Sequence, residues 1–82
     1  AKGVLICGSG IGMSMAANRH KGIRAALCHN AYTAAAARAH NDANVLCMGE
    51  RALGLGTAEA VVEAWLCASF EGGRHLDRIN KF

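Results

Sequence analysis

The chain has 82 residues, of which 52% are hydrophobic and 18% are charged, and its formal net charge is +3. A chain of this length holds one domain with a small core. Its basic residues are not gathered in one run, which argues against nucleic acid as a partner, although small anionic ligands remain possible. The sequence shows neither an apolar run of membrane-spanning length nor a signal pattern at its start. These features predict a soluble protein with no membrane partner, and the cytoplasm is its default location.

Three strands alternating with helices are predicted along the chain. Strands are predicted over residues 2–7, 23–28 and 44–48. Helices are predicted over residues 12–20, 31–40, 57–69 and 75–81. The first strand carries the apolar run Val4-Leu5-Ile6 and is expected to be buried on both faces. The helix over residues 57–69 places Val61, Val62, Trp65, Leu66 and Ser69 along one face.

This alternation predicts an α/β fold that is Rossmann-like, with three α/β/α layers and a parallel sheet. The chain supplies about three strands and the helices that follow them. Three strands make a thin sheet, because parallel strands need cover on both faces and protected edges. We therefore expect that more of the sheet exists elsewhere.

Four cysteines lie at intervals of about twenty residues and form no C-x-x-C pair: Cys7, Cys28, Cys47 and Cys67. This spacing indicates a repeating strand–helix unit and no metal site. Cysteine is usually a buried structural residue, and we assign that role to Cys28, Cys47 and Cys67. Cys7 differs, because it ends the first predicted strand and precedes a helix, at the edge where open α/β sheets bind ligands. A thiol there has a lowered pKa, which favours a functional role.

The strongest local motif is Cys7-Gly8-Ser9-Gly10-Ile11-Gly12, where the first strand meets a helix. Backbone N–H groups in such a loop converge on an anion. A dinucleotide site would need a third glycine where Met13 stands, so NAD is not expected. A simple tight turn is the alternative interpretation.

Two further groups of residues are candidates for catalysis or ligand binding. His40 and Asn41 are expected in the loop before the third strand, where the imidazole could act as an acid or base. Arg74 and Arg78 are four residues apart and would share a helix face suited to phosphate. The alternatives are a histidine that caps a helix and a solvated basic face. The capping role is also assigned to the remaining histidines, which are His20, His29 and His75.

The segments VLICGSGIGMSMAANRHKGIRAALC, AHNDANVL and EGGRHLDR together resemble ribose-5-phosphate isomerase B and the wider family that includes galactose-6-phosphate isomerase. The resemblance covers essentially the whole chain. It implies a Rossmann-like isomerase that interconverts D-ribose 5-phosphate and D-ribulose 5-phosphate through a cis-enediolate, in the pentose phosphate pathway. It implies no metal and no cofactor.

Position by position, the resemblance makes Cys7 the base that moves the proton. Ser9 would assist, and His40 would open the furanose ring. The anion hole for the enediolate would consist of the amides of Gly8, Ser9, Gly10, Ile11 and Gly12. The remaining substrate contacts would come from Asn41, Arg51, Arg74 and Arg78, the last two holding the phosphate.

The resemblance also implies a homodimer, often paired into a tetramer, with active sites shared between subunits. One feature departs from the family pattern, since no segment matches the first family strand with its Asp-His pair. We therefore expect residues 1–82 to be one domain, the carboxyl-terminal part of the family fold without its first strands, and to be inactive alone. Two alternatives remain open. One is an isomerase of a six-carbon sugar phosphate, such as allose or galactose 6-phosphate, and the other is a non-catalytic phosphosugar-binding or oligomerisation module.

Overall fold

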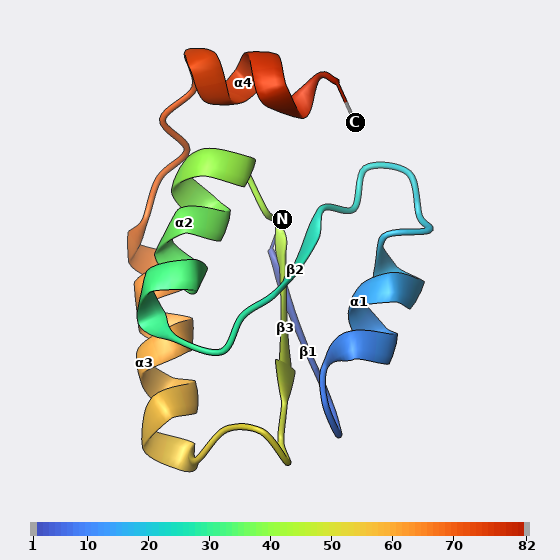
Figure 1. Ribbon diagram of the computed structural model, residues 1–82, viewed down its shortest axis with the longest axis vertical. Coiled ribbons are helices and arrows are strands. Elements are labelled where there is room, and N and C mark those ends of the chain that lie inside the picture. Colours follow the sequence, from blue (N-terminus) through green and yellow to red (C-terminus); the bar gives the residue numbers. More distant parts are fainter. Residues whose placement is uncertain (1, 82) are drawn as a thin grey trace.

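The computed structural model describes residues 2–81 and alternates strands with helices (Figure 1). The strands are β1 (Gly3–Cys7), β2 (Ala25–Leu27) and β3 (Val45–Gly49). The helices are α1 (Ile11–Ala17), α2 (Ala31–Asn41), α3 (Leu55–Cys67) and α4 (Arg74–Ile79). Each predicted element is present within the described residues, with its ends shifted by up to a few positions. None of these helices is long and apolar enough to cross a membrane.

The three strands form one parallel sheet in the order β1-β3-β2. The chain passes from β1 beyond β3 to β2 and then returns to β3, so its two crossovers run in opposite directions. Right-handed crossovers in opposite directions place their helices on opposite faces of the sheet. Figure 1 shows this arrangement, with α1 on one side and α2 with α3 on the other. The predicted α/β/α layering is confirmed.

The core lies between the sheet and the layer formed by α2 and α3. All five residues of the central strand β3 are buried, and Leu46 is completely inaccessible. Trp65 and Val61 on α3 are also fully buried and belong to the same cluster. Ala34 on α2 has no exposed surface, and its short side chain lets α2 pack closely against α3. The face predicted for α3 is thus correct for Val61 and Trp65, whereas Leu66 is exposed and Ser69 lies beyond the end of the helix.

The expectation that the first strand is buried on both faces is wrong. Val4 and Ile6 remain 43% and 57% exposed, whereas Leu5 on the other face lies against α1. The reason is the strand order, which places β1 at an edge and β3 in the centre. Both helices of the opposite layer pack around β3, so that one face of β1 stays open. The central strand shows the double burial that was predicted for β1.

Helix α1 ends earlier than predicted, and its final cap protects the other edge of the sheet. Asn18 caps α1, and its side-chain amide donates to the carbonyl oxygen of Ala25 at 2.9 Å. The Asn18 side-chain oxygen accepts from the N–H of Ala25 at 2.8 Å. One side chain thus satisfies both backbone groups of a residue in β2. An edge strand with paired backbone groups is less prone to recruit another strand.

The predicted burial of the structural cysteines is correct for two of the three. Cys28 and Cys47 are buried, and burial raises the pKa of each thiol. Cys67 is exposed, contrary to expectation. It is the last residue of α3, and the neighbouring Leu66 is also 52% exposed, because the core-facing side of this helix is occupied by Val61 and Trp65.

Candidate active site

The glycine loop leaves the sheet beside the end of the central strand. Cys7 pairs in register with Gly49, so β1 and β3 end next to each other. The N–H of Glu50 donates to the carbonyl oxygen of Cys7 at 2.8 Å, and the N–H of Arg51 donates to that of Gly8 at 3.0 Å. These hydrogen bonds hold the two loops together at the carboxyl edge of the sheet. This is the edge at which open α/β sheets bind their ligands.

Two glycines allow this close approach. Gly10 has a φ of +82°, and a side chain there would meet Leu27 and lie 2.9 Å from the backbone carbonyl carbon of Met48. A β-carbon on Gly49 would lie 2.6 Å from the α-carbon of Ser9. The glycine loop therefore rests directly on the end of β3. Gly49 was not among the predicted site residues, although a glycine that ends a buried strand is a signal for such contact.

The Cys7 thiol is surrounded by backbone donors. The N–H of Gly10 donates to Cys7 Sγ at 3.2 Å. The pKa of the Cys7 thiol is lowered, chiefly by the N–H of Met13 and further by those of Gly10 and Ser9. Desolvation and the Glu50 carboxylate act in the opposite direction and are outweighed. The direction of the shift agrees with the expectation from sequence, because hydrogen bonds to a thiolate favour its charged form.

The loop and a neighbouring cation form one pocket of about 490 Å³, lined by Cys7, Gly8, Ser9, Gly12, Arg51 and Ala52. The guanidinium carbon of Arg51 lies 3.6 Å from the position that a β-carbon on Gly8 would occupy. The Ser9 hydroxyl oxygen accepts from the N–H of Ile11 at 3.2 Å, at the start of α1. The pocket thus combines a thiol, backbone donors and a positive charge. Such a combination suits an anionic substrate that exchanges a proton.

A second group of predicted site residues lies at the other end of the molecule. Helix α2 runs against the direction of the strands, so its last residues, His40 and Asn41, lie at the amino edge of the sheet. Helix α4, with Arg74 and Arg78, packs on that end of α2 (Figure 1). One chain therefore does not bring these residues to Cys7. The structure divides the predicted site into the Cys7 pocket and an α2–α4 group.

The predicted loop position of His40 and Asn41 is incorrect, because both residues belong to α2. The helix extends to Asn41 and is capped by Asp42, whose φ is +52° and whose N–H donates to the carbonyl oxygen of Ala37. Arg38 bonds the Asp42 carboxylate at 2.6 Å and stabilises this ending. His40 is consequently held on a helix instead of a loop.

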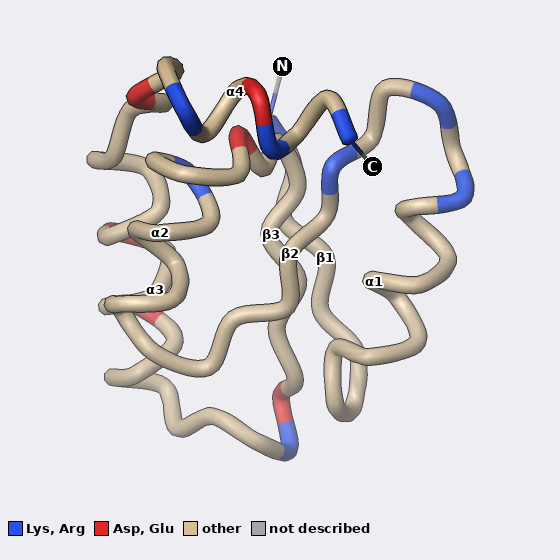
Figure 2. Tube along the Cα trace, turned by 45° about the horizontal axis from the view of Figure 1, so that its top comes forward, with Lys and Arg blue, Asp and Glu red and all other residues tan. Residues whose placement is uncertain are grey.

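Arg74 and Arg78 lie on one short helix, as the spacing predicted. Both are exposed, and within residues 2–81 neither has a carboxylate partner within 4.0 Å. Figure 2 shows that most Lys and Arg residues gather at the end of the molecule that carries α4. This end offers a positive surface to an anion such as phosphate.

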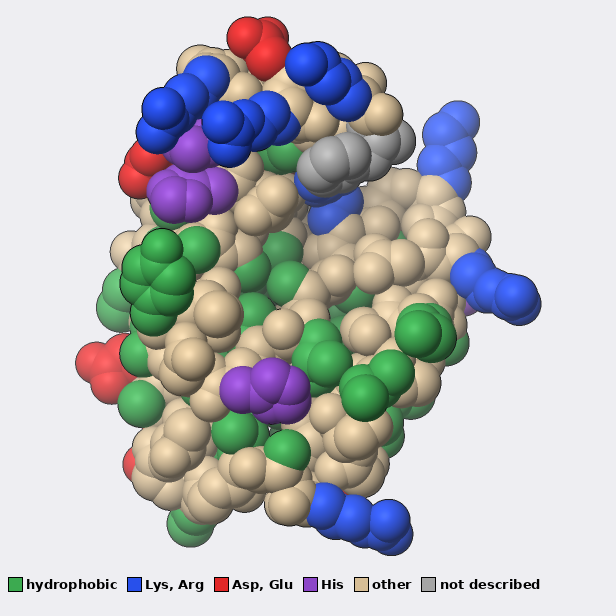
Figure 3. Space-filling model, viewed as in Figure 1, with side chains coloured by type: hydrophobic (Ala, Val, Ile, Leu, Met, Phe, Trp, Pro, Cys, Tyr) green, Lys and Arg blue, Asp and Glu red, His purple; other side chains and the backbone are tan. Residues whose placement is uncertain are grey.

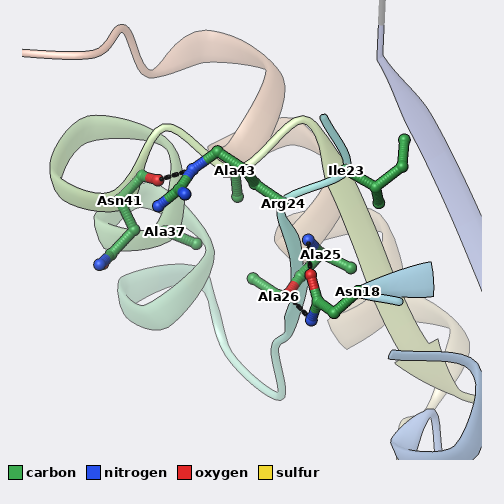
Figure 4. A pocket seen from close by; sticks show the side chains of 8 residues that line it. All are labelled: Asn18, Ile23, Arg24, Ala25, Ala26, Ala37, Asn41 and Ala43. Atoms are coloured by element: carbon green, nitrogen blue, oxygen red, sulfur yellow. Dashed lines mark hydrogen bonds between the residues drawn. The ribbon is translucent and has the colours of Figure 1, made fainter. Parts of the chain in front are cut away.

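Asn41 also borders a separate pocket of about 390 Å³ between α2 and β2 (Figure 4). Its backbone carbonyl oxygen accepts from Arg24 Nε at 3.0 Å. This hydrogen bond engages the main chain of Asn41, so the side-chain amide is not the group that holds Arg24.

Sequence reasoning missed two residues of the α2–α4 group. His75 was assigned a capping role, but its ring is buried and stacks on that of His40, with Glu71 beside both. The spacing of Glu71 and His75, four residues apart, was the available signal. His40 lies far from both in the sequence, so its proximity depends on tertiary packing.

Comparisons with known proteins agree with the fold and with the order of the motifs. The chain is 53% identical over 77 residues to ribose-5-phosphate isomerase B of Escherichia coli (strain K12), which covers 94% of this chain and 52% of that protein. The structure of ribose-5-phosphate isomerase B from Clostridium thermocellum is similar, with a TM-score of 0.95 and 54% identity over 98% of this chain and 54% of that one.

A third similar structure is ribose-5-phosphate isomerase B of Mycoplasma genitalium with bound ribulose-5-phosphate. Its TM-score is 0.94 and its identity is 50%, over 98% of this chain and 53% of that one. The chain thus spans about half the length of the relatives that it matches. The family model described as Ribose/Galactose Isomerase matches residues 1–82. With this match and the shared fold, the chain belongs to the ribose/galactose isomerase family.

Proposed function

We propose that the protein is an aldose–ketose isomerase that interconverts D-ribose 5-phosphate and D-ribulose 5-phosphate. The observation that carries this proposal is the Cys7 thiol, whose pKa is lowered by backbone N–H groups at the carboxyl edge of the sheet. Further support comes from the similarity to a relative solved with ribulose-5-phosphate. The resulting place in metabolism is the pentose phosphate pathway.

In the proposed reaction the Cys7 thiolate removes the proton from C2 of the open aldose. The C–H electron pair forms the C1–C2 double bond, and the carbonyl electrons move to oxygen and give a cis-enediolate. The amides of the loop over residues 8–12 stabilise that oxyanion, and the Ser9 hydroxyl assists proton movement. A proton then passes from the C2 hydroxyl to O1, the C2 carbonyl forms from the O2 electrons, and the C1–C2 double bond takes back the proton from the thiol at C1. The chemistry needs neither a metal nor an organic cofactor.

The remaining roles fall to residues of the α2–α4 group. His40 would donate and accept the protons that open the furanose ring, and Asn41 would bind substrate hydroxyls. Arg74 and Arg78 would hold the phosphate, while Arg51 would contact the ligand from the Cys7 pocket. The placement of the two groups at opposite ends of the chain supports a homodimer. Each active site would combine the Cys7 pocket of one subunit with the α2–α4 group of the other. Two such dimers could pair into a tetramer.

We further propose that residues 1–82 are one domain that forms the carboxyl-terminal part of the family fold. The coverage of about half of each relative supports this assignment. The four free cysteines suit a reducing compartment, which favours the cytoplasm. A six-carbon sugar phosphate is the alternative substrate, because no residue described above contacts the sugar's far end. A non-catalytic phosphosugar-binding module is the alternative from another class.

The function is tested by replacing Cys7 in the intact protein. Cys7→Ser should lower kcat by about 10²-fold or more and leave KM nearly unchanged, because an alkoxide forms far less readily than a thiolate. Iodoacetamide should inactivate in step with modification of Cys7, and ribose 5-phosphate should protect. Cys67→Ser is the matched control, since it replaces an exposed thiol at the end of α3. Full activity after complete alkylation of Cys7 would remove it as the base, and binding of the sugar phosphate without turnover would favour the non-catalytic module.

A further inference from the structure

The imidazole of His40 is flanked by two side chains, one just before α4 and one in its first turn. The ring of His75 stacks on that of His40, with centroids 4.2 Å apart and planes inclined by 10°. Glu71 Oε1 lies 3.8 Å from His40 Nε2 and 3.4 Å from His75 Nε2. Figure 3 shows histidine side chains gathered beneath Lys and Arg side chains at this end of the molecule. The imidazole of His40 thus has a ring against one face and a carboxylate near its Nε2 edge.

Backbone contacts hold both neighbours of His40 in place. The N–H of Glu71 donates to the carbonyl oxygen of Ala39 at 2.9 Å, which ties the Glu71 main chain to the residue before His40. The side chain of His75 is only 10% exposed, and its N–H donates to the carbonyl oxygen of Gly72 at 3.1 Å. The side chain of His40 is 44% exposed, so part of its ring is accessible to a ligand. The imidazole is therefore fixed from one side and open on the other.

Glu71 supplies a negative charge beside His40. Within residues 2–81 no other carboxylate lies within 4.0 Å of either imidazole, and no Lys or Arg side chain lies within that distance of Glu71. The Lys and Arg residues gathered at this end of the molecule oppose a further positive charge (Figure 2). A nearby carboxylate stabilises the positive charge that an imidazole gains with a proton. The charge of Glu71 is therefore available to the two histidines.

Opening of the furanose ring requires an imidazole that is well placed and charged in turn. In that step His40 takes the proton of the O1 hydroxyl, and the O–H electron pair forms the C1 carbonyl. The C1–O4 bond breaks, its electron pair goes to O4, and the imidazolium gives its proton to O4. Such a step loses rate steeply when the group is misplaced, since a shift of about 1 Å can cost about 10²-fold.

We propose that Glu71 and His75 are positioning residues for His40 in ring opening. His75 is the platform that fixes the plane of the His40 ring, and Glu71 stabilises the charge of that ring after it has accepted the proton. Neither residue touches the sugar in this role, so both act through His40. This assignment rests on the proposed function, from which it takes the ring-opening role of His40. Loss of either residue should slow the opening of a cyclic substrate and spare the proton transfer by Cys7.

An aldose phosphate that cannot close into a ring separates the two steps. In D-erythrose 4-phosphate the phosphate occupies the hydroxyl that would close a five-membered ring, so only the proton transfer is needed. In the intact protein, Glu71→Gln should lower kcat for ribose 5-phosphate by about tenfold or more and leave kcat for erythrose 4-phosphate nearly unchanged. His40→Gln should give the same selective loss, whereas Cys7→Ser should slow both substrates. Glu59→Gln is the matched control, because Glu59 is an exposed carboxylate on α3.

The platform role of His75 is tested by the shape of its replacement. His75→Phe keeps a flat ring for stacking and should retain more activity toward ribose 5-phosphate than His75→Leu. His75 is buried, so circular dichroism must show that both variants are folded, and Glu71→Gln decides if they are not. If erythrose 4-phosphate is a poor substrate, exchange of the C1 protons of ribulose 5-phosphate with D₂O replaces it, because that ketose is acyclic for the same reason.

The outcomes distinguish the positioning role from the proposed function. Absence of isomerisation by the native protein, or full activity of Cys7→Ser, would overturn the function and the positioning role with it. The same holds for the positioning role if His40→Gln shows no selective loss. If His40→Gln slows the cyclic substrate alone while Glu71→Gln slows both substrates equally or neither, the positioning role is overturned and the function stands. An equal selective loss in Glu59→Gln would have the same meaning.

Discussion

Gly49 decides whether the glycine loop can rest on the sheet. Its missing side chain leaves the space that the Ser9 backbone fills, so this residue shapes the Cys7 pocket without contributing a reactive group. The pairing of Cys7 with Gly49 brings the two strand ends together, and the lack of a β-carbon lets the loop lie across them. The shape of the Cys7 pocket thus depends on Gly49, which has no side chain and takes no part in the reaction.

Replacing Gly49 by alanine should push the loop away from β3. We expect Gly49→Ala to lower the free energy of unfolding by about 1–3 kcal/mol, the usual cost of forcing atoms into a filled site. Displaced amides should also stabilise the Cys7 thiolate less, so the pH midpoint of Cys7 alkylation should rise toward about 8.5, the ordinary thiol value. Urea denaturation and the pH dependence of iodoacetamide labelling measure the two effects.

Gly56→Ala is the control for this substitution. Gly56 lies in α3, and a β-carbon there meets nothing within 4 Å. Alanine is the better helix former, so this variant should be as stable as the original chain or more so. Equal stability of Gly49→Ala and Gly56→Ala would show that the loop does not need the space above Gly49.

Strand β1 is the element that the chain leaves least protected. It lies at an edge of the sheet, and Val4 and Ile6 expose one apolar face. Ile6 also borders a pocket of about 350 Å³ with Met48 and Leu55, so the open surface continues toward the start of α3. Exposed edges with apolar side chains recruit other strands or chains. The opposite edge differs, because the Asn18 side chain pairs with β2.

The isolated 82-residue chain should therefore associate through β1. We expect light scattering to show oligomers for the original chain and a clear shift toward monomer for Ile6→Lys, because a charge on this face opposes its burial. Tyr32→Lys is the matched control, since Tyr32 is 79% exposed on α2 and away from β1. A stable monomer of the original chain, or equal dissociation by both variants, would contradict this role of β1.

At the scale of the whole molecule, the two groups of predicted site residues lie at opposite ends of one chain. The Cys7 pocket lies at the carboxyl edge of the sheet, and Arg74 lies with α4 at the opposite end. No small side-chain movement joins them within one chain, because the sheet lies between. In the proposed symmetric dimer, each of the two active sites would combine the Cys7 pocket of one subunit with the α2–α4 group of the other.

Mixing two inactive variants tests this arrangement in the intact protein. Cys7→Ser and Arg74→Ala chains, mixed equally with subunit exchange verified, should recover roughly a quarter of native activity, since half of the dimers are mixed and each has one complete site. The control replaces the second partner by Cys7→Ser/Arg74→Ala, which leaves no dimer with an intact Cys7. Absence of recovery despite exchange would place Cys7 and Arg74 in the site of the same subunit, or Arg74 outside it.

The amino-acid sequence alone predicted the features that depend on neighbours along the chain. The apolar runs and glycines located each strand and helix, Cys7 was assigned to a strand end with a lowered pKa, and the spacing of Arg74 and Arg78 placed both on one helix. These inferences succeed because helical and extended backbones impose fixed periods on neighbouring side chains. Local hydrogen bonds likewise act within a few residues.

The tertiary structure decided what depends on strand order and on packing between distant segments. The strand order β1-β3-β2 left one face of β1 exposed. The pairing of Cys7 with Gly49 placed Gly49 under the glycine loop. The stacking of His40 on His75 and the separation of the two groups of site residues arose in the same way. The periodicity of apolar residues predicts whether a position is buried, but it does not predict which distant residue packs against it. The packing partner depends on how the surfaces of whole helices and strands fit together.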